Sequence, residues 1–208
     1  GGPVNIGDYI RKAYSDGGIR EFDSKFMSKV YEKPFTVEVT EYDRVPGSKE
    51  DSKPVGRHLD GCRIGFDAGG SDRKVSAVID GEVVFSEEVI WHPKLHGNPD
   101  YHYGEILAAM KSAASHMPRV DAIGVSSAGI FINNRVKVAS LFIKVPEDLF
   151  EKKVKDIYIN IGKEMGNVPI EVANDGDVTA LAGAMDLEDN NVLGIAMGTS
   201  EAGGYVDS

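Results

Sequence analysis

Three glycine-marked turns in a fixed order constrain the fold of this 208-residue chain more than any other feature. The first, GFDAGGS at residues 65–71, follows an apolar run, and the third, GIAMGTS at residues 194–200, contains one. The second, ANDGD at residues 173–177, places a carboxylate at the start of a predicted helix. Glycine lets the backbone reverse tightly and bring N–H groups close to an anion. Two phosphate-binding turns with an acid between them indicate phosphoryl transfer.

The first turn lies between two predicted strands and is therefore a hairpin loop. Backbone N–H groups of Gly69 and Gly70 and the hydroxyl of Ser71 can bind phosphate oxygens, while Asp67 can hold a hydrated Mg²⁺. The loop is not a Walker A motif, because no Gly-Lys-Ser/Thr follows, and a dinucleotide fingerprint would require a helix after the glycines. An ordinary tight turn, in which the aspartate accepts a local hydrogen bond from the backbone, is the alternative.

The second turn follows a predicted strand and opens an alanine-rich helix. A carboxylate at a helix N-terminus is stabilised in its ionised form, so Asp175 suits a general base that deprotonates a hydroxyl attacking a γ-phosphate. Asn174 can hydrogen-bond a neighbouring hydroxyl of the substrate. Helix capping is the alternative for both residues, since Asp and Asn are common N-caps.

Further polar residues follow two other predicted strands. Gly198, Thr199 and Ser200 resemble a second phosphate loop, with a plain hairpin turn as the alternative. Ser126 and Ser127 can contact a substrate, and Ser127 is the candidate substrate contact, although a buried turn in which the hydroxyl bonds to the backbone is the favoured alternative. We interpret His92, His96 and His102 as surface-loop histidines and Lys94 as a solvated charge.

Hydrophobic spacing predicts helices and strands along the whole chain. The expected helices lie in two pieces within residues 4–32 and at residues 101–116, 147–165 and 176–186. The expected strands lie at residues 35–42, 63–67, 73–79, 82–90, 120–125, 131–134, 135–138, 169–172, 192–196 and 202–206, with tight turns at Asp80–Gly81 and Asn133–Asn134.

From about residue 62, three strands joined by hairpins precede strands that arrive through helical crossovers. This order predicts an α/β fold with a mixed sheet flanked by helices on both faces. We expect an N-terminal extension over residues 1–60, containing helices, a strand and a linker. A first lobe over residues 61–190 and the opening strands of a second lobe over residues 191–208 would follow.

Charge and composition exclude several classes of protein. The net charge of −10 disfavours nucleic-acid binding, and residues 1–60 hold 10 basic and 11 acidic side chains, so they form no basic arm. No apolar run is long enough to span a bilayer, and no secretory leader is visible. Cys62 is the single cysteine, which fits a reducing, cytoplasmic setting and a small buried apolar side chain.

Taken together, the motifs resemble the sugar kinase, Hsp70 and actin superfamily, and most closely its ROK family of sugar kinases and sugar-responsive repressors. The likeness covers about residues 62–208. It rests on the turn at residues 65–71, the GVSSAGI segment at residues 124–130, the VPIEVAND stretch at residues 168–175, and Met197-Gly198-Thr199 followed by Gly203-Gly204. The resemblance implies a ribonuclease H-like sheet, as in the first lobe of an actin-like ATPase.

The resemblance also implies a function and a set of site residues. Asp175 would be the catalytic base, Asn174 a sugar ligand, and the turns around Gly69 and Gly198 would hold the phosphates of ATP with Mg²⁺. The implied activity is ATP-dependent phosphorylation of a sugar hydroxyl by a glucokinase-like enzyme that is a homodimer when full length. The alternatives are a non-catalytic sugar-sensing transcriptional regulator and another ATPase of the superfamily.

The chain departs from the family pattern at several points. Ser71 stands where the family often has Thr, and the usual sugar-contacting Asn is not evident near Ala139-Ser140-Leu141. Asp175-Gly176-Asp177 stands where the family has an aspartate-alanine-asparagine run. The family's Glu-x-Gly-His sugar motif and its zinc-binding cysteines are absent from these residues. We therefore expect an active site that is incomplete within this chain.

Overall fold

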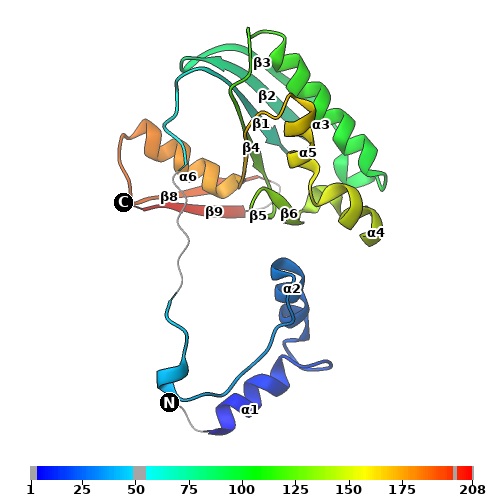
Figure 1. The fold of residues 1–208 in the computed structure, drawn as a ribbon, viewed down its shortest axis with the longest axis vertical. Coiled ribbons are helices and arrows are strands. Elements are labelled where there is room, and N and C mark those ends of the chain that lie inside the picture. The colour runs from blue at the N-terminus through cyan, green and yellow to red at the C-terminus, as the bar shows by residue number, and fades with distance from the viewer. Residues whose placement is uncertain (1–3, 49–54, 199–200, 208) are drawn as a thin grey trace. The chain divides into compact units, whose positions relative to one another are not determined.

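The computed structural model describes residues 4–48, 55–198 and 201–207. The chain divides into two compact units, Gly1–Val55 and Gly56–Ser208, which we call unit 1 and unit 2 (Figure 1). The three glycine turns all belong to unit 2.

Unit 1 consists of two helices followed by an extended segment. Helix α1 spans Val4–Ala13, α2 spans Glu21–Tyr31, and a 3-10 turn, η1, spans Tyr42–Arg44. The strand predicted over residues 35–42 is wrong, because this segment pairs with no strand in the described part of unit 1. Phe35 instead stacks on Tyr14 with ring centroids 4.9 Å apart.

Unit 2 is built on a five-stranded mixed sheet with the strand order β3-β2-β1-β4-β7 (Figure 1). Its strands are antiparallel from β3 to β1 and parallel from β1 through β4 to β7, which confirms the predicted mixed sheet. The bounds are β1 Cys62–Ala68, β2 Asp72–Ile79, β3 Glu82–Ile90, β4 Ala122–Ser127 and β7 Ile170–Asn174.

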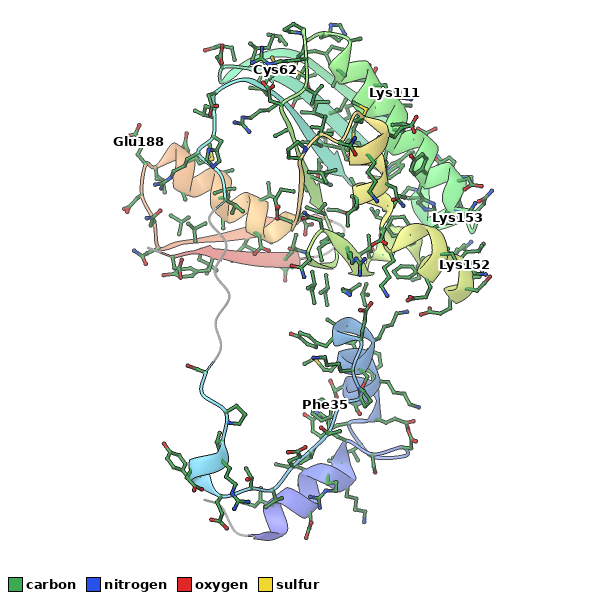
Figure 2. The ribbon with its side chains drawn as sticks, in the orientation of Figure 1. Phe35, Cys62, Lys111, Lys152, Lys153 and Glu188 are labelled. Atoms are coloured by element: carbon green, nitrogen blue, oxygen red, sulfur yellow. The ribbon has the colours of Figure 1, made fainter. Side chains whose placement is uncertain are left out.

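Helices lie on both sides of this sheet. Helices α3 (Pro99–Ala114) and α5 (Ile157–Glu164) cover one face, and α6 (Asp175–Asp186) lies on the other side (Figure 1). Alternate residues of β1 point into the core on the α3 side, and Cys62 among them is 2% exposed, as expected for a small apolar residue. Lys152 and Lys153, by contrast, project from the outer surface (Figure 2).

The two predicted tight turns are present. Asp80 and Gly81 join β2 to β3 with φ of 49° and 87°. Asn133 and Asn134, with φ of 53° and 63°, join β5 (Ile130–Ile132) to β6 (Arg135–Val138). Consecutive positive φ values match the right-handed twist of hairpin strands, and Asn, Asp and Gly adopt them most readily.

The single helix predicted over residues 147–165 is wrong. The segment divides into α4 (Glu147–Leu149), a π-helical turn, η4 (Phe150–Val154), and α5. The carbonyl oxygen of Lys155 accepts a hydrogen bond from the N–H of Val136 in β6, so this carbonyl is bonded to the β5–β6 hairpin. Apolar spacing alone does not reveal such an interruption, because the apolar residues of η4 and α5 are buried in the same core.

A further hairpin, β8 (Val192–Met197) and β9 (Glu201–Val206), packs against α6. Glycine permits this close packing. A Cβ on Gly204 would press against the Cα of Asp177 and the carbonyl oxygen of Gly176, well inside van der Waals contact. The hairpin and α6 therefore approach backbone to backbone.

Candidate functional site

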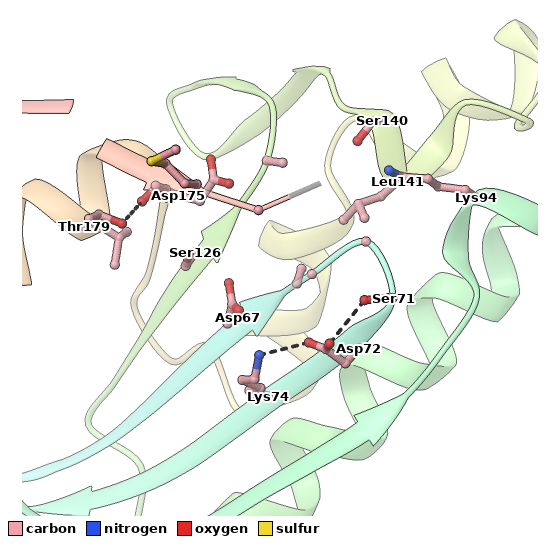
Figure 3. A pocket seen from close by; sticks show the side chains of 18 of the residues that line it. Asp67, Ser71, Asp72, Lys74, Lys94, Ser126, Ser140, Leu141, Asp175 and Thr179 are labelled. Atoms are coloured by element: carbon pink, nitrogen blue, oxygen red, sulfur yellow. Dashed lines mark hydrogen bonds and ion pairs between the residues drawn. The ribbon is translucent and has the colours of Figure 1, made fainter. Parts of the chain in front are cut away.

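A cleft of about 670 Å³ lies where β1 and β4 end and α6 begins (Figure 3). It brings together residues from all three glycine turns, among them Asp67, Gly69, Asp175 and Gly198. The described residues that line it are Asp67, Ala68, Gly69, Gly70, Ser71, Asp72, Lys74, Lys94, Ser126, Ala128, Ser140, Leu141, Asp175, Val178, Thr179, Ala182, Ala196, Met197 and Gly198.

Two hydrogen bonds from Trp91 hold the first glycine turn. Trp91, which is 1% exposed, donates from Nε1 to the carbonyl oxygen of Gly69 at 2.8 Å, and its backbone N–H donates to Ser71 at 3.1 Å. A Cβ on Gly69 would lie 2.6 Å from the carbonyl oxygen of Asp72, so only glycine fits there without a shift of the backbone. Trp91 is therefore a core residue that anchors the turn.

Two charged residues beside this turn were not singled out from the sequence. The carboxylate of Asp72 accepts from Lys74 Nζ at 3.0 Å and from Ser71 Oγ at 3.2 Å. The hydrogen bond from Lys74 is the main reason that the pKa of Asp72 is lowered, and the same bond raises the pKa of Lys74. No short-range sequence signal distinguishes this pair from ordinary alternating charges on an exposed strand.

Asp175 and Asn174 lie at the junction of β7 and α6, but they take different positions. Asp175 is half-buried, and it lines the cleft at the first turn of α6. Asn174 is the N-cap: its Oδ1 accepts from the N–H of Gly176 at 2.8 Å, and its Nδ2 donates to the carbonyl oxygen of Gly129 at 2.9 Å. Asn174 is not among the residues that line the cleft.

The neighbouring Asp177 differs from Asp175. Its pKa is raised, first because the protein partly removes its carboxyl group from water and second because Asp175 is negatively charged. Asp177 is not a cleft residue, so it gives a natural comparison for Asp175 on the same helix turn.

The structure agrees with the buried alternative for Ser127 and does not place this residue in the cleft. The parallel register pairs Asp67 with Ser126 and Ala68 with Ser127, so Ser126 faces the cleft and Ser127 faces the core. Ser127 is 0% exposed, and its Oγ has no hydrogen-bond partner among the described residues. Ser126 therefore takes the place in the cleft wall that was expected for Ser127.

The second phosphate turn is described only in part. Gly198 lines the cleft, and a Cβ there would meet nothing within 4 Å, so this glycine faces open space. Thr199 and Ser200, the other two predicted phosphate contacts, lie outside the described residues.

Two further predictions from the sequence fail beyond β3. Lys94, which was expected to be solvated, is half-buried in the 3-10 turn η2 (Pro93–Leu95), and it lines the cleft. His102, expected on a surface loop, lies in α3 with 0% exposure. Its Nε2 lies 3.0 Å from the carbonyl oxygens of both Pro93 and Leu141.

The residues around the first turn fit a nucleotide with Mg²⁺. Asp67 supplies a carboxylate oxygen beside the turn, which is too tight for any side chain at Gly69. One such carboxylate fits Mg²⁺, because this ion takes few protein ligands when phosphates and water supply the others. In the described ranges, no three His, Cys, Asp or Glu side chains form a group that could hold a metal ion alone.

No family model matches the chain, and no curated protein matches it in sequence. Solved structures do match. The inorganic polyphosphate/ATP-glucomannokinase from Arthrobacter sp. strain KM has a TM-score of 0.53 and 24% identity, covering 69% of this chain and 57% of its own. The ROK hexokinase from Thermus thermophilus has a TM-score of 0.53 and 19% identity, covering 71% and 46%.

A ROK family transcriptional regulator, a homologue of the E. coli MLC protein, has a TM-score of 0.56 and 18% identity, covering 72% of this chain and 37% of its own. The chain thus spans between 37% and 57% of the length of these three structures. None of the helices described here is both long and apolar enough to cross a bilayer.

The mixed sheet with helices on both sides is the fold of the actin-like ATPases. Within that class, the matching structures include ROK sugar kinases and a ROK regulator. The resemblance to ROK proteins noted from the motifs is therefore confirmed at the level of the fold, over about 70% of the chain.

Proposed function

We propose that this chain provides the first lobe of an ATP-dependent sugar kinase of the ROK type. The proposal rests mainly on one observation. Asp67 and the turn at Gly69–Ser71 line the same cleft as Asp175, which is far from them in the sequence. A phosphate-binding turn that faces a carboxylate across a cleft is the arrangement that phosphoryl transfer to a hydroxyl requires.

In this proposal, each part of the cleft has a separate task. Backbone N–H groups of Gly69, Gly70 and Gly198, with Ser71, Thr199 and Ser200, hold the phosphates of ATP, and Asp67 holds Mg²⁺. The cation, when bound, neutralises charge on the phosphates. Asp175 accepts the proton of the sugar hydroxyl as the hydroxyl oxygen bonds to the γ-phosphorus in line and the bond from that phosphorus to the leaving ADP breaks. Asn174 acts indirectly in this proposal, because it caps α6 and so keeps Asp175 at the cleft.

The decisive test replaces Asp175 by Asn in the full-length protein and measures phosphate transfer from ATP to a panel of sugars. We expect kcat to fall by about 10²- to 10⁴-fold with little change in sugar binding, because a positioned base contributes about that much. Asp177→Asn is the matched control on the same turn and should keep its turnover. Equal turnover in Asp175→Asn and the unmodified protein would refute the role of Asp175.

A sugar-sensing regulator is the second candidate, and one observation favours it. Residues 1–55 form a separate compact unit that precedes the kinase-like unit, and an effector domain would occupy such a position. A DNA-binding titration at several salt concentrations separates the two candidates, since binding through phosphates weakens steeply with salt. Salt-dependent DNA binding without any ATP turnover on the sugar panel would favour the regulator.

A further inference from the structure

The ammonium group of Lys94 has no polar partner among the residues that the structure describes. No carboxylate in the described residues forms an ion pair or hydrogen bond with it, although the side chain is half-buried in the cleft wall. Figure 3 shows the side chain extending toward Ser140 and Leu141. An ammonium group that faces the cleft without a carboxylate beside it favours a ligand with negative charge, because such a ligand supplies the charge-assisted hydrogen bonds that the described residues do not.

The two turns that carry Lys94 and Ser140 are fixed to one another. Lys94 belongs to η2, and Ser140 opens the 3-10 turn η3 (Ser140–Phe142). The buried His102 lies between them, with Nε2 3.0 Å from the carbonyl oxygen of Pro93 and 3.0 Å from that of Leu141. Each carbonyl belongs to the residue next to Lys94 or Ser140. The corner formed by these two side chains is therefore preorganised, which lowers the entropy cost of binding.

The other cation in the cleft is already neutralised. Lys74 Nζ lies 3.0 Å from Asp72 Oδ1 and 3.9 Å from Glu88 Oε1. Lys94 has no such partner, in a protein whose net charge is −10. Its wall of the cleft comes from η2 and η3, which are separate from both glycine turns. Lys94 thus enters the cleft from a wall that holds none of the proposed phosphate contacts, and the ADP measurement below separates an acceptor ligand from a nucleotide ligand.

We propose that Lys94 and the hydroxyl of Ser140 bind a carboxylate on the acceptor, which makes the preferred substrate an acidic monosaccharide, a hexuronate or an aldonate. This inference rests on the proposed sugar-kinase function. An ammonium and a hydroxyl from two fixed turns can donate to the two oxygens of one carboxylate, and such charge-assisted bonds are stronger than those to a neutral hydroxyl. A neutral hexose would leave the charge of Lys94 uncompensated.

The test is a binding measurement that needs no turnover. Calorimetry on the full-length protein compares D-glucuronate, D-galacturonate and D-gluconate with D-glucose and D-galactose. We expect at least one acid to bind roughly 10- to 100-fold more tightly than its neutral counterpart, and Lys94→Gln to remove that preference. Lys94→Arg should retain part of it. Lys152→Gln, which removes the same charge from the outer surface, should leave the preference intact.

Two results would overturn the inference. The first is that no acid binds more tightly than its neutral counterpart. The second is that Lys94→Gln weakens binding of ADP while the affinity for the acids is unchanged, which would assign Lys94 to the nucleotide. Failure of the kinase proposal looks different: acids would still bind in a Lys94-dependent way, but no sugar on the panel would accept phosphate from ATP.

Discussion

Trp91 shows how a single buried side chain can set the geometry of the first glycine turn. Its indole N–H donates to Gly69 at 2.8 Å from a position that is 1% exposed. In Trp91→Phe, the carbonyl oxygen of Gly69 loses this partner. We expect the free energy of unfolding to fall by about 1 to 3 kcal/mol and the affinity for nucleotide to fall several-fold.

Amide hydrogen exchange at Gly69–Ser71 measures the loosening of the turn without relying on any activity. Exchange there should accelerate in Trp91→Phe. Tyr101→Phe is the control, since it removes a nearby hydrogen bond, the one from the N–H of His92 to the tyrosine oxygen, without touching the turn. Equal exchange rates at the turn in both variants would show that Trp91 does not hold it.

His102 makes stability depend on pH in a defined direction. Its pKa is lowered, mainly because burial disfavours the charged imidazolium, and the nearby His96 acts in the same sense. The folded protein thus binds fewer protons at this residue than the unfolded chain does. The stability from His102 is complete above its ordinary pKa of 6.5 and is lost as the pH falls below that value toward the lowered pKa.

Chemical denaturation between about pH 7.5 and about pH 5 tests this sign, and the slope from one group is at most about 1.4 kcal/mol per pH unit. We expect His102→Gln to be less stable at the upper pH, because the glutamine fills the site imperfectly, but to show a shallower loss on acidification. A slope identical to that of the unmodified protein would contradict a role for His102 in this titration.

At the scale of elements, the junction between α6 and the β8–β9 hairpin depends on glycine, which has no side chain, at position 204. Gly204→Ala would place a methyl group against the backbone of Asp177 and Gly176. We expect a loss of about 1 to 3 kcal/mol or more from overpacking. The matched control is Gly203→Ala on the same strand, where the nearest atom to an added Cβ is 3.8 Å away. Thermal unfolding of both variants measures the difference, and equal midpoints would contradict this close contact.

The elements that sequence predicts well are those whose signals are local. The hairpin turns at residues 80–81 and 133–134 are specified by residues that tolerate positive φ, and α6 is specified by its cap at Asn174. The strand predicted over residues 35–42 alternates as a strand should, but alternation does not supply a pairing partner. The interruption between α4 and α5 depends on a hydrogen bond from β6, which no local pattern reveals.

In the cleft, too, local sequence signals predict some residues, whereas others depend on contacts between distant segments. Asp67, Gly69 and Asp175 follow strands that the sequence predicts, and the carboxyl ends of neighbouring parallel strands meet at one edge of a sheet. The choice between Ser126 and Ser127 depends on the register of β4, where a shift of one residue changes the face of the sheet. The sequence did not predict that Lys94 lines the cleft. Its place there is set by His102, whose Nε2 contacts the carbonyl oxygens of Pro93 and Leu141, the residues next to Lys94 and Ser140.

At the scale of the whole molecule, the two units have very different amounts of core. Unit 2 buries a continuous apolar cluster that extends from Cys62 to Val172. Among the described residues of unit 1 whose side chains are placed, only Ala13 and Val30 are buried apolar residues. A fragment as short as unit 1 gains little from burial against the entropy of ordering its chain.

We therefore expect a fragment of residues 56–208 to unfold cooperatively, with a midpoint close to that of the full chain, because its core lies within the fragment. A fragment of residues 1–55 should show weak helical circular dichroism and no cooperative transition. Two helices of 10 and 11 residues are marginal in water without a packed face. Thermal unfolding followed by circular dichroism measures both fragments.

A sharp transition in residues 1–55 would mean that unit 1 gains its stability from something other than apolar burial. Loss of the transition in residues 56–208 would mean that the core of unit 2 depends on residues 1–55.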